Sequence, residues 1–279
     1  MIFFYDFYRI KCLKMAKQGI LLKMHGEIGD EVSYFLPLGP DIINMNELLG
    51  ETIELEYQGI IHCIRCGRVT RKSFAQGFCY PCFTTAPETS ECVLRPELCR
   101  AHEGESRDMK WSEDHCLQDH FVYLAISSGL KVGVTRSSQV PTRWIDQGAW
   151  KAIRLAKTPN RFLAGQIEVE MKAKMSDKTN WRHMLTNEID RDIDLVKEKN
   201  VASGFLKKEL SIYLSPDNEI TEINYPVLQY PVKVKSLSFD KLNIICGKLS
   251  GIKGQYLIFS DGSVLNIRKH NGYLINLET

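Results

Sequence analysis

The chain has 279 residues, which is long enough for two domains and for three if they are small. Hydrophobic residues make up 44% and charged residues 25%, an ordinary balance for a globular protein in water. The formal net charge of +2 is too small to indicate a nucleic-acid partner by itself, so any basic surface has to be local. No apolar run reaches the roughly 20 residues that a membrane-spanning helix requires.

The first part of the chain, residues 15–60, is expected to be β-rich. Strand candidates are Gly19–Met24, Val32–Leu38 and the cleanly alternating Thr52–Tyr57. Residues 1–13 are apolar, but early charges interrupt them and no small-residue cleavage site follows, so a secretory signal is not expected and a cytoplasmic location is predicted. Met15 is an alternative start, which leaves residues 1–14 as an extension or a first strand.

Cysteine is concentrated in one stretch of the chain. Of nine cysteines, seven lie between positions 63 and 116, while Cys12 and Cys246 stand alone. In a reducing compartment, clustered thiols indicate metal binding more than disulfides. The stretch 61–116 also has few aliphatic residues and many turn formers. We therefore expect it to be a double zinc-binding module that folds around its metal.

Two Cys-x-x-Cys pairs, with twelve residues between them, define the first predicted zinc site. Its ligands are Cys63, Cys66, Cys79 and Cys82, four soft thiolates of the kind that a tetrahedral zinc ion requires. A pair of redox motifs is the weaker interpretation, because such motifs normally occur singly on a βα unit. The spacing therefore predicts a structural zinc site of the zinc-ribbon type.

A second cluster of potential ligands follows. Cys92, Cys99 and Cys116 are its thiols, and the fourth ligand is either His102, which has knuckle spacing to Cys99, or His120. Buried free cysteines and surface histidines are the alternative. Four protein ligands leave no open coordination position, so both sites are predicted to be structural.

Basic residues surround the first cysteine pair. Arg65 and Arg68, with Arg71 and Lys72 close behind, are candidates for contact with nucleic-acid phosphates. An ordinary solvated charged face is the equally open alternative.

The segment 117–180 has a compact α/β pattern. Phe121–Ile126 and Leu130–Val134 flank a Ser-Ser-Gly turn and predict a hairpin. A short helix is expected over Pro141–Gln147, followed by a third strand at Ala152–Ala156. Thr158 and Pro159 then predict a helix start, with Thr158 as its cap.

Residues 181–279 are predicted as a helical connector and a second β-rich segment. The connector covers 181–205, with helix expected over 181–199, and the β-rich segment covers 206–279. Its clearest hairpin signal joins Gly254–Phe259 to Val264–Ile267 through Asp261 and Gly262. The two β-rich ends are expected to form one small barrel together or one barrel each.

Within 117–180, Phe121-Val122-Tyr123, Lys131-Val132-Gly133, Arg143 and Glu168 follow one another in the order and spacing of the GIY-YIG endonuclease superfamily. The segment resembles that family, whose fold is a small three-stranded sheet flanked by helices. The resemblance implies an α+β protein in which a GIY-YIG-like domain follows the zinc module and β-rich segments flank both.

The same resemblance implies a set of functional residues. Tyr123 would orient or deprotonate the attacking water, Arg143 would pair with the phosphate, and Glu168 would hold a magnesium or manganese ion. Gly133 would allow close backbone approach. Lys131 stands where the family usually has a tyrosine, so a relative that binds without cutting is the alternative.

Charge in this segment agrees with a polyanion partner. Residues 117–175 contain nine Lys and Arg against four Asp and Glu. Lys131 and Arg136 are therefore candidate nucleic-acid contacts. The structural alternatives are an ordinary strand tyrosine at Tyr123 and an ion pair of Glu168 with Lys172, one helical turn away.

Most of the chain also resembles an uncharacterised bacterial family known only as a domain of unknown function. The shared features are the cysteine clusters followed by His120–Ala125, Lys131–Val134 and Gln147–Ala149.

The function expected from the sequence is therefore nucleic-acid binding, to RNA or DNA, with metal-dependent phosphodiester cleavage as its catalytic form. The rival is a non-catalytic scaffold, stapled by zinc, that docks another protein and carries a degenerate nuclease fold. An enzyme that modifies RNA or a small molecule in the same cleft is the third possibility.

Overall fold

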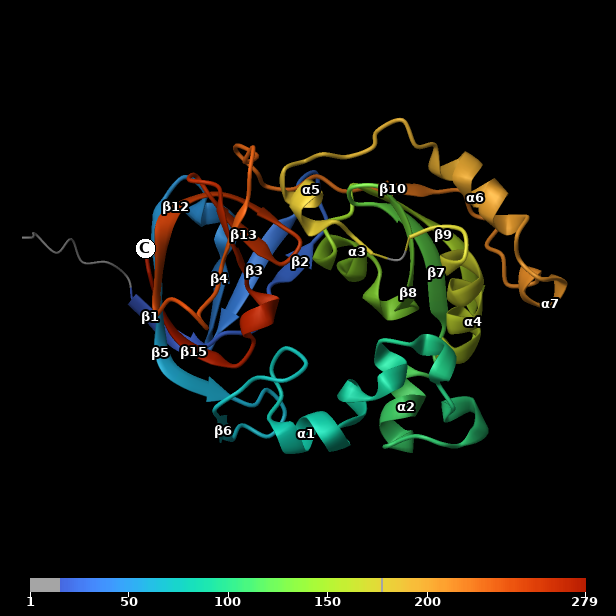
Figure 1. The fold of residues 1–279 in the computed structure, drawn as a ribbon, viewed down its shortest axis with the longest axis horizontal. Coiled ribbons are helices and arrows are strands. Elements are labelled where there is room, and N and C mark those ends of the chain that lie inside the picture. The colour runs from blue at the N-terminus through green and yellow to red at the C-terminus, as the bar shows by residue number, and fades with distance from the viewer. Residues whose placement is uncertain (1–15, 177) are drawn as a thin grey trace, which may run out of the picture.

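A computed structural model describes residues 16–176 and 178–279, so Cys12 and Met15 lie outside the described residues. The protein is a mixed α+β structure in which several sheets lie on one side of a cysteine-rich segment (Figure 1). None of the helices in the described ranges has the length and apolar character needed to cross a bilayer.

The largest sheet joins both β-rich ends of the chain. Its hydrogen-bonded order is β1-β15-β5-β12-β13-β14-β11, with β6 paired to β5. The strands are β1 (Ala16–Ile20), β5 (Thr52–His62), β6 (Val69–Thr70), β11 (Lys235–Leu237), β12 (Ile244–Lys253), β13 (Tyr256–Phe259), β14 (Ser263–Asn266) and β15 (Tyr273–Glu278).

The predicted barrel is wrong, because no pairing in the described part of the chain joins the two end strands, β1 and β11. Strand β5 lies between β12 and β15, so a strand from the first quarter of the chain is inserted between strands of the C-terminal segment. Three further strands, β2 (His25–Glu27), β3 (Ser33–Leu38) and β4 (Asp41–Asn44), form a separate small sheet.

A four-stranded antiparallel sheet forms the centre of the α/β region, in the order β10-β9-β7-β8. Its members are β7 (His120–Ile126), β8 (Leu130–Arg136), β9 (Lys151–Thr158) and β10 (Ile220–Glu222). The three strands predicted from the sequence are present. The fourth, β10, comes from the C-terminal segment and pairs with the edge of β9.

Short helices complete the molecule. The α-helices are α1 (Tyr80–Thr85), α2 (Met109–His115), α3 (Thr142–Asp146), α4 (Arg161–Lys172), α5 (Trp181–Leu185), α6 (Leu195–Ser203) and α7 (Lys208–Ser211). The 3-10 turns are η1 (Met45–Leu48), η2 (Pro87–Thr89), η3 (Glu91–Val93), η4 (Pro96–Leu98), η5 (Ala101–Glu103), η6 (Ser137–Gln139) and η7 (Arg268–His270).

The start of α4 differs from the prediction. Thr158 remains in β9, where it pairs with His120 of β7. The cap is Asn160, whose side chain accepts a hydrogen bond from the Leu163 N–H at 3.0 Å. The helix predicted over 181–199 is also divided, because α5 ends at Leu185 and α6 begins ten residues later, after the cap Asp194.

Strand β7 shows how the sequence alternation builds two layers. Val122, Leu124 and Ile126 enter a core that contains residues of α4 and α6. Tyr123 and Ala125, on the opposite face, enter the larger core that contains the β-rich sheets. The four-stranded sheet therefore lies between helices α4 and α6 on one face and the β-rich part on the other. Helix α3 packs into the core on the β-rich side, and this fixes the position of Arg143.

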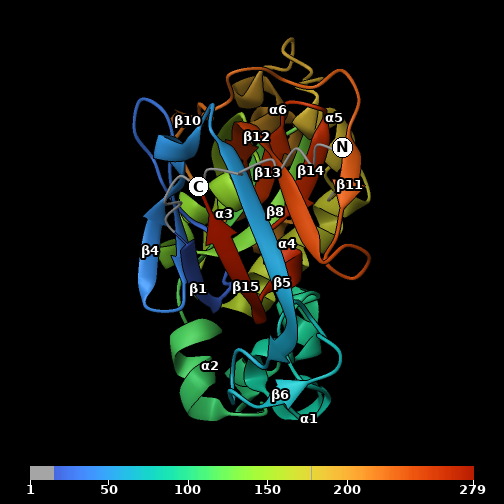
Figure 2. The same ribbon diagram turned by 90° about the vertical axis from the view of Figure 1, so that its left-hand side faces the viewer.

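The cysteine-rich segment packs beneath these two parts (Figures 1 and 2). Its own buried clusters consist of cysteines with very few other side chains, such as Phe78, Ala86 and Ala101. One anchor is η4, which lies against α4 at Gly165. An ideal Cβ at Gly165 would lie 2.2 Å from the backbone nitrogen of Glu97, so only glycine permits this contact.

We predict that Gly165→Ala destabilises the protein by about 1–3 kcal/mol, because the obstructing atoms are backbone and η4 has to move away from α4. Thermal unfolding measures the effect. Gly129→Ala is the matched control, since nothing lies within 4 Å of its Cβ position. Equal melting temperatures for the two variants would contradict this view of the α4–η4 contact.

Candidate functional site

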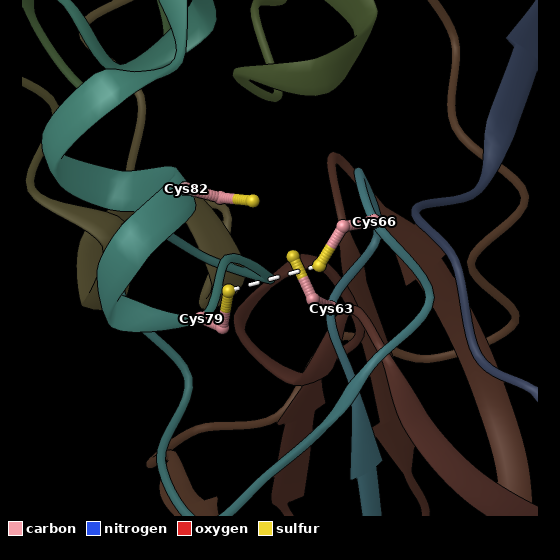
Figure 3. Close-up of side chains that lie close together, drawn as sticks. All are labelled: Cys63, Cys66, Cys79 and Cys82. Atoms are coloured by element: carbon pink, nitrogen blue, oxygen red, sulfur yellow. Dashed lines mark hydrogen bonds between the residues drawn. The ribbon is translucent and has the colours of Figure 1, made fainter.

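The first predicted metal site comes together in the structure. Cys63 and Cys66 follow the end of β5, while Cys79 and Cys82 come from the cap and first turn of α1, and the four side chains converge (Figure 3). Their sulfur atoms all lie within 4.8 Å of one another, and the Cys66 and Cys79 sulfurs are 3.8 Å apart. A tetrahedral zinc ion with Zn–S bonds of about 2.3 Å requires sulfurs about 3.8 Å apart.

The local backbone prepares these thiols to bind a cation. Burial of Cys63 raises its pKa, but hydrogen bonds from the backbone N–H groups of Cys66, Cys79 and Arg65 together lower it to about 6. The Arg68 backbone N–H lowers the pKa of Cys66 in the same way. Gly67, with φ of +72°, closes the turn by donating to the Cys63 carbonyl at 2.8 Å.

A second group of three cysteines also comes together. The sulfurs of Cys92, Cys99 and Cys116 lie within 4.8 Å of one another. Neither candidate for the fourth ligand joins them. The His102 ring stacks on Phe162 with centroids 4.4 Å apart, and His120 lies in β7 outside the sulfur group. Both cysteine clusters could hold a metal ion such as zinc.

The residues that the sequence linked to catalysis lie beside one another. Tyr123 and Gly133 are opposite each other in β7 and β8, and a Cβ at Gly133 would lie 2.6 Å from the tyrosine hydroxyl. The hydroxyl donates to Gln147 Oε1 at 2.9 Å, and Lys131 Nζ donates to the same oxygen. Burial raises the pKa of Tyr123; nearby, Arg143 acts to lower it and Glu168 to raise it.

This Tyr123 cluster is closed to solvent. Tyr123 has no exposed surface, and Lys131 and Glu168 are also buried. The Glu168 carboxylate pairs with Lys172 Nζ at 3.2 Å, the ion pair that the helical spacing indicated. Arg143 lies beside Tyr123 and also borders an open pocket, so it connects the buried cluster to that pocket.

That open pocket, which we call the arginine pocket, has a volume of ≈ 230 Å³ and lies where the three parts of the molecule meet. Five cationic side chains border it together with His120 and one carboxylate. The cations are Lys23, Arg136, Arg143, Arg161 and Arg268, and the carboxylate is Asp146. Val93, Leu94 and Pro96 of the cysteine-rich segment form an apolar wall.

The arginines crowd one another. Burial lowers the pKa of Arg136, and the neighbouring Arg161 lowers it further. Burial and then Arg143 lower the pKa of Arg268 in the same way. Asp146 lies 3.0 Å from Lys23 Nζ and 4.0 Å from an Arg268 nitrogen, so its single charge is already shared. The pocket lining therefore carries more positive than negative charge, although Asp114 and Cys116 also act on Arg136 from nearby.

The predicted nucleic-acid contacts divide between the pocket and the rest of the molecule. Arg136 borders the pocket, while Lys131 belongs to the buried Tyr123 cluster. Arg65 pairs with Glu88, and the Arg68 side chain hydrogen-bonds to the Cys66 thiol. Sequence reasoning missed Lys23, Arg161 and Arg268, because no local motif connects three residues that come from distant segments.

These features define an α+β protein with two cysteine clusters and a pocket lined by cationic side chains at the junction of its parts. The chain belongs to the family described as protein of unknown function DUF2797, which matches residues 50–275. No curated protein and no solved structure matches it. Strands β1 to β4 and Lys23 therefore lie outside the matched range.

We predict that the purified protein carries one metal ion per cysteine cluster. Cys79→Ser should lose one of the two ions, because removal of one thiolate leaves the first site incomplete. Elemental analysis by mass spectrometry measures the content. Cys246→Ser, at an exposed cysteine outside both clusters, should retain both ions. Unchanged metal content in Cys79→Ser would contradict the assignment.

Proposed function

We propose that the protein binds nucleic acid by gripping its phosphate backbone in the arginine pocket. The observation that carries the proposal is the convergence of five cationic side chains with one carboxylate around a single pocket. Guanidinium groups match phosphate oxygens through paired, planar hydrogen bonds, and a phosphate would relieve the repulsion between neighbouring arginines.

The size of the pocket favours part of a polymer over a whole small molecule. Its volume of ≈ 230 Å³ is below the range of about 300–1,000 Å³ that is usual for pockets enclosing a small-molecule ligand. One phosphate with the adjoining sugar is a better match. Binding through phosphates would also explain how a chain of small net charge can bind a polyanion, since the charge is concentrated at one place.

The cysteine clusters have a structural part in this proposal. Zinc in a ribbon-like first site would fix the turn after β5, and metal in the second site would fix the segment that forms the apolar wall. Arg161 connects the second cluster to the pocket, because its Nη1 donates to the Cys92 carbonyl at 3.2 Å and its Nη2 to the His115 carbonyl at 3.1 Å.

Phosphodiester cleavage is the second candidate function, in a GIY-YIG-like centre. The proximity of Tyr123, Arg143 and Glu168 favours it, as does the position of Arg143 at the edge of the arginine pocket. Arg143 would hold the scissile phosphate, Tyr123 would orient water, and Glu168 would hold magnesium or manganese. Because Tyr123 is fully buried, the phosphate would have to displace the side chains that cover it.

The proposed binding site can be tested by removing single arginines from the pocket. Arg143→Ala and Arg268→Ala should each weaken nucleic-acid binding about 10-fold to 100-fold, the usual effect of removing one charge-assisted contact. Each should also reduce the slope of log K against log salt by about 0.7–0.9 per lost phosphate contact. Fluorescence anisotropy over a salt series measures both quantities.

The control is Arg100→Ala, an exposed arginine that pairs with Glu103 and Glu105 away from the pocket. Its affinity and salt slope should equal those of the wild type. If Arg143→Ala and Arg268→Ala also bind like the wild type, the arginine pocket is not the binding site. A wild-type protein that binds neither RNA nor DNA would leave the zinc-stapled protein scaffold as the better description.

The catalytic candidate predicts that the protein cleaves nucleic acid when a divalent metal ion is present. Labelled RNA or DNA incubated with magnesium or manganese should be cut by the wild type and not by Glu168→Gln, which keeps the shape of the side chain but removes its charge. Gel electrophoresis of the products measures cleavage. Binding without cleavage by the wild type would rule out the catalytic candidate and support a protein that only binds.

A further inference from the structure

A second pocket opens onto the second cysteine cluster. Cys92, Cys99 and Cys116 all line it, so the pocket borders the group whose sulfur atoms lie within 4.8 Å of one another. Its volume of ≈ 600 Å³ is within the range of about 300–1,000 Å³ that is usual for pockets enclosing a small-molecule ligand. We call it the thiol pocket. No residue of the described structure lines both this pocket and the arginine pocket.

The second cluster supplies fewer ligands than a tetrahedral metal ion takes. Zinc in a closed structural site has four protein ligands, whereas only three thiols come together here within the described part of the chain. The two carboxylates that line the thiol pocket are each paired with an arginine. Glu91 accepts from Arg95 at 3.0 Å, and Glu105 accepts from Arg100 at 2.7 Å. One coordination position therefore has no side-chain ligand among the described residues.

The two cysteine clusters differ in this respect. The first has four sulfurs and is closed, as a structural site is, while a metal site with three protein ligands keeps a position for another molecule. We propose that the metal ion of the second cluster binds an exogenous ligand from the thiol pocket in its fourth position, and that this ligand is the thiolate of a small organic molecule.

The surroundings of the cluster favour a thiolate. Three cysteine thiolates form a soft ligand set, which a fourth sulfur completes better than an oxygen does. The added negative charge would be offset by two arginines. Arg161 lies beside the cluster, since its Nη1 donates to the Cys92 carbonyl at 3.2 Å and its backbone N–H to the Cys116 carbonyl at 2.8 Å. Arg107 lines the pocket and donates to the Ala86 carbonyl at 2.8 Å.

The pocket also offers a place for the carbon part of such a molecule. Trp111 and Leu98 line it, and Leu98 is 40% exposed, so apolar surface is available for burial by a ligand. Binding is an exchange of ligands without electron transfer. A water molecule leaves the metal ion, a metal–sulfur bond forms, and the proton of the thiol passes to the solvent.

The test uses the full chain loaded with Co²⁺, because zinc has no absorption of its own whereas cobalt bound to thiolates absorbs light. Titration with 2-mercaptoethanol, in a buffer free of other thiols, should raise the charge-transfer absorption of the second site by about one third, because its bound thiolates increase from three to four. The rise should saturate, and both ions should remain bound by mass spectrometry. Ethylene glycol, which has oxygen in place of the sulfur, should leave the spectrum unchanged.

Five variants locate the response. Cys116→Ser should lose it together with the ion of the second cluster, while Cys246→Ser, at an exposed cysteine outside both clusters, should respond like the wild type. His102→Phe, His120→Phe and Cys12→Ser should also respond like the wild type, because each keeps the three thiols of the cluster. Circular dichroism establishes that each variant is folded.

An unchanged wild-type spectrum at high 2-mercaptoethanol overturns the proposal. If His102→Phe, His120→Phe or Cys12→Ser responds where the wild type does not, the substituted residue is the fourth ligand and the site is closed. A response that persists in Cys116→Ser also overturns the proposal, as does loss of cobalt during the titration, since the added thiol would then replace the cysteines. The wild-type titration decides the question even if the variants do not fold. Nucleic acid is absent from the measurement, so either result leaves the proposed function untouched.

Discussion

Four arginine side chains are held close together at the junction of the three parts of the molecule, and the repulsion between their guanidinium groups is the main physical constraint on the candidate site. Arg136 and Arg161 form one crowded pair, and Arg143 and Arg268 form another. Like charges held this close are unfavourable unless negative charge offsets them. Asp146 is the one carboxylate that borders the pocket, and Asp114 and Cys116 act on Arg136 from beyond it. Under the proposed function, a phosphate would bind here and bring the missing negative charge.

Three separate parts of the chain hold those arginines in place. The α/β sheet and its helices supply Arg136, Arg143 and Arg161, while the β-rich part supplies Lys23 and Arg268. The cysteine-rich segment closes the pocket with an apolar wall and ties down Arg161 through the Cys92 and His115 carbonyls. Because that segment has almost no apolar core of its own, its shape depends on the cysteine clusters. Metal binding and anion binding are therefore expected to be coupled through Arg161.

Short sequence patterns predicted the features that depend on neighbouring residues alone. The alternation of β7 and β8 and the spacing of the first four cysteines indicated a hairpin and a convergent ligand set, and the structure contains both. The cap of α4 was assigned to the wrong residue, because pairing across the sheet keeps Thr158 in β9 and leaves Asn160 to cap the helix. Barrel closure failed for a similar reason, since it depends on whether distant edge strands meet, which no local pattern reports.

The candidate site also contains some residues that a local motif identifies and others that only the tertiary fold brings together. Arg143 was found through a motif, but Lys23 and Arg268 lie at opposite ends of the chain, and only the tertiary fold brings them to one pocket. The sequence offers His120 as a possible fourth metal ligand, but His120 is not part of the three-cysteine group and borders the pocket. Packing between distant segments decides which residues border the pocket, and such packing is difficult to infer from a single sequence.

The most direct test of the central claim is a crystal structure of the full chain with a short single-stranded oligonucleotide. The claim predicts a phosphate group between Arg143 and Arg268, with further phosphates leading out of the arginine pocket. An oligonucleotide bound on another face, with only water in the pocket, would contradict it.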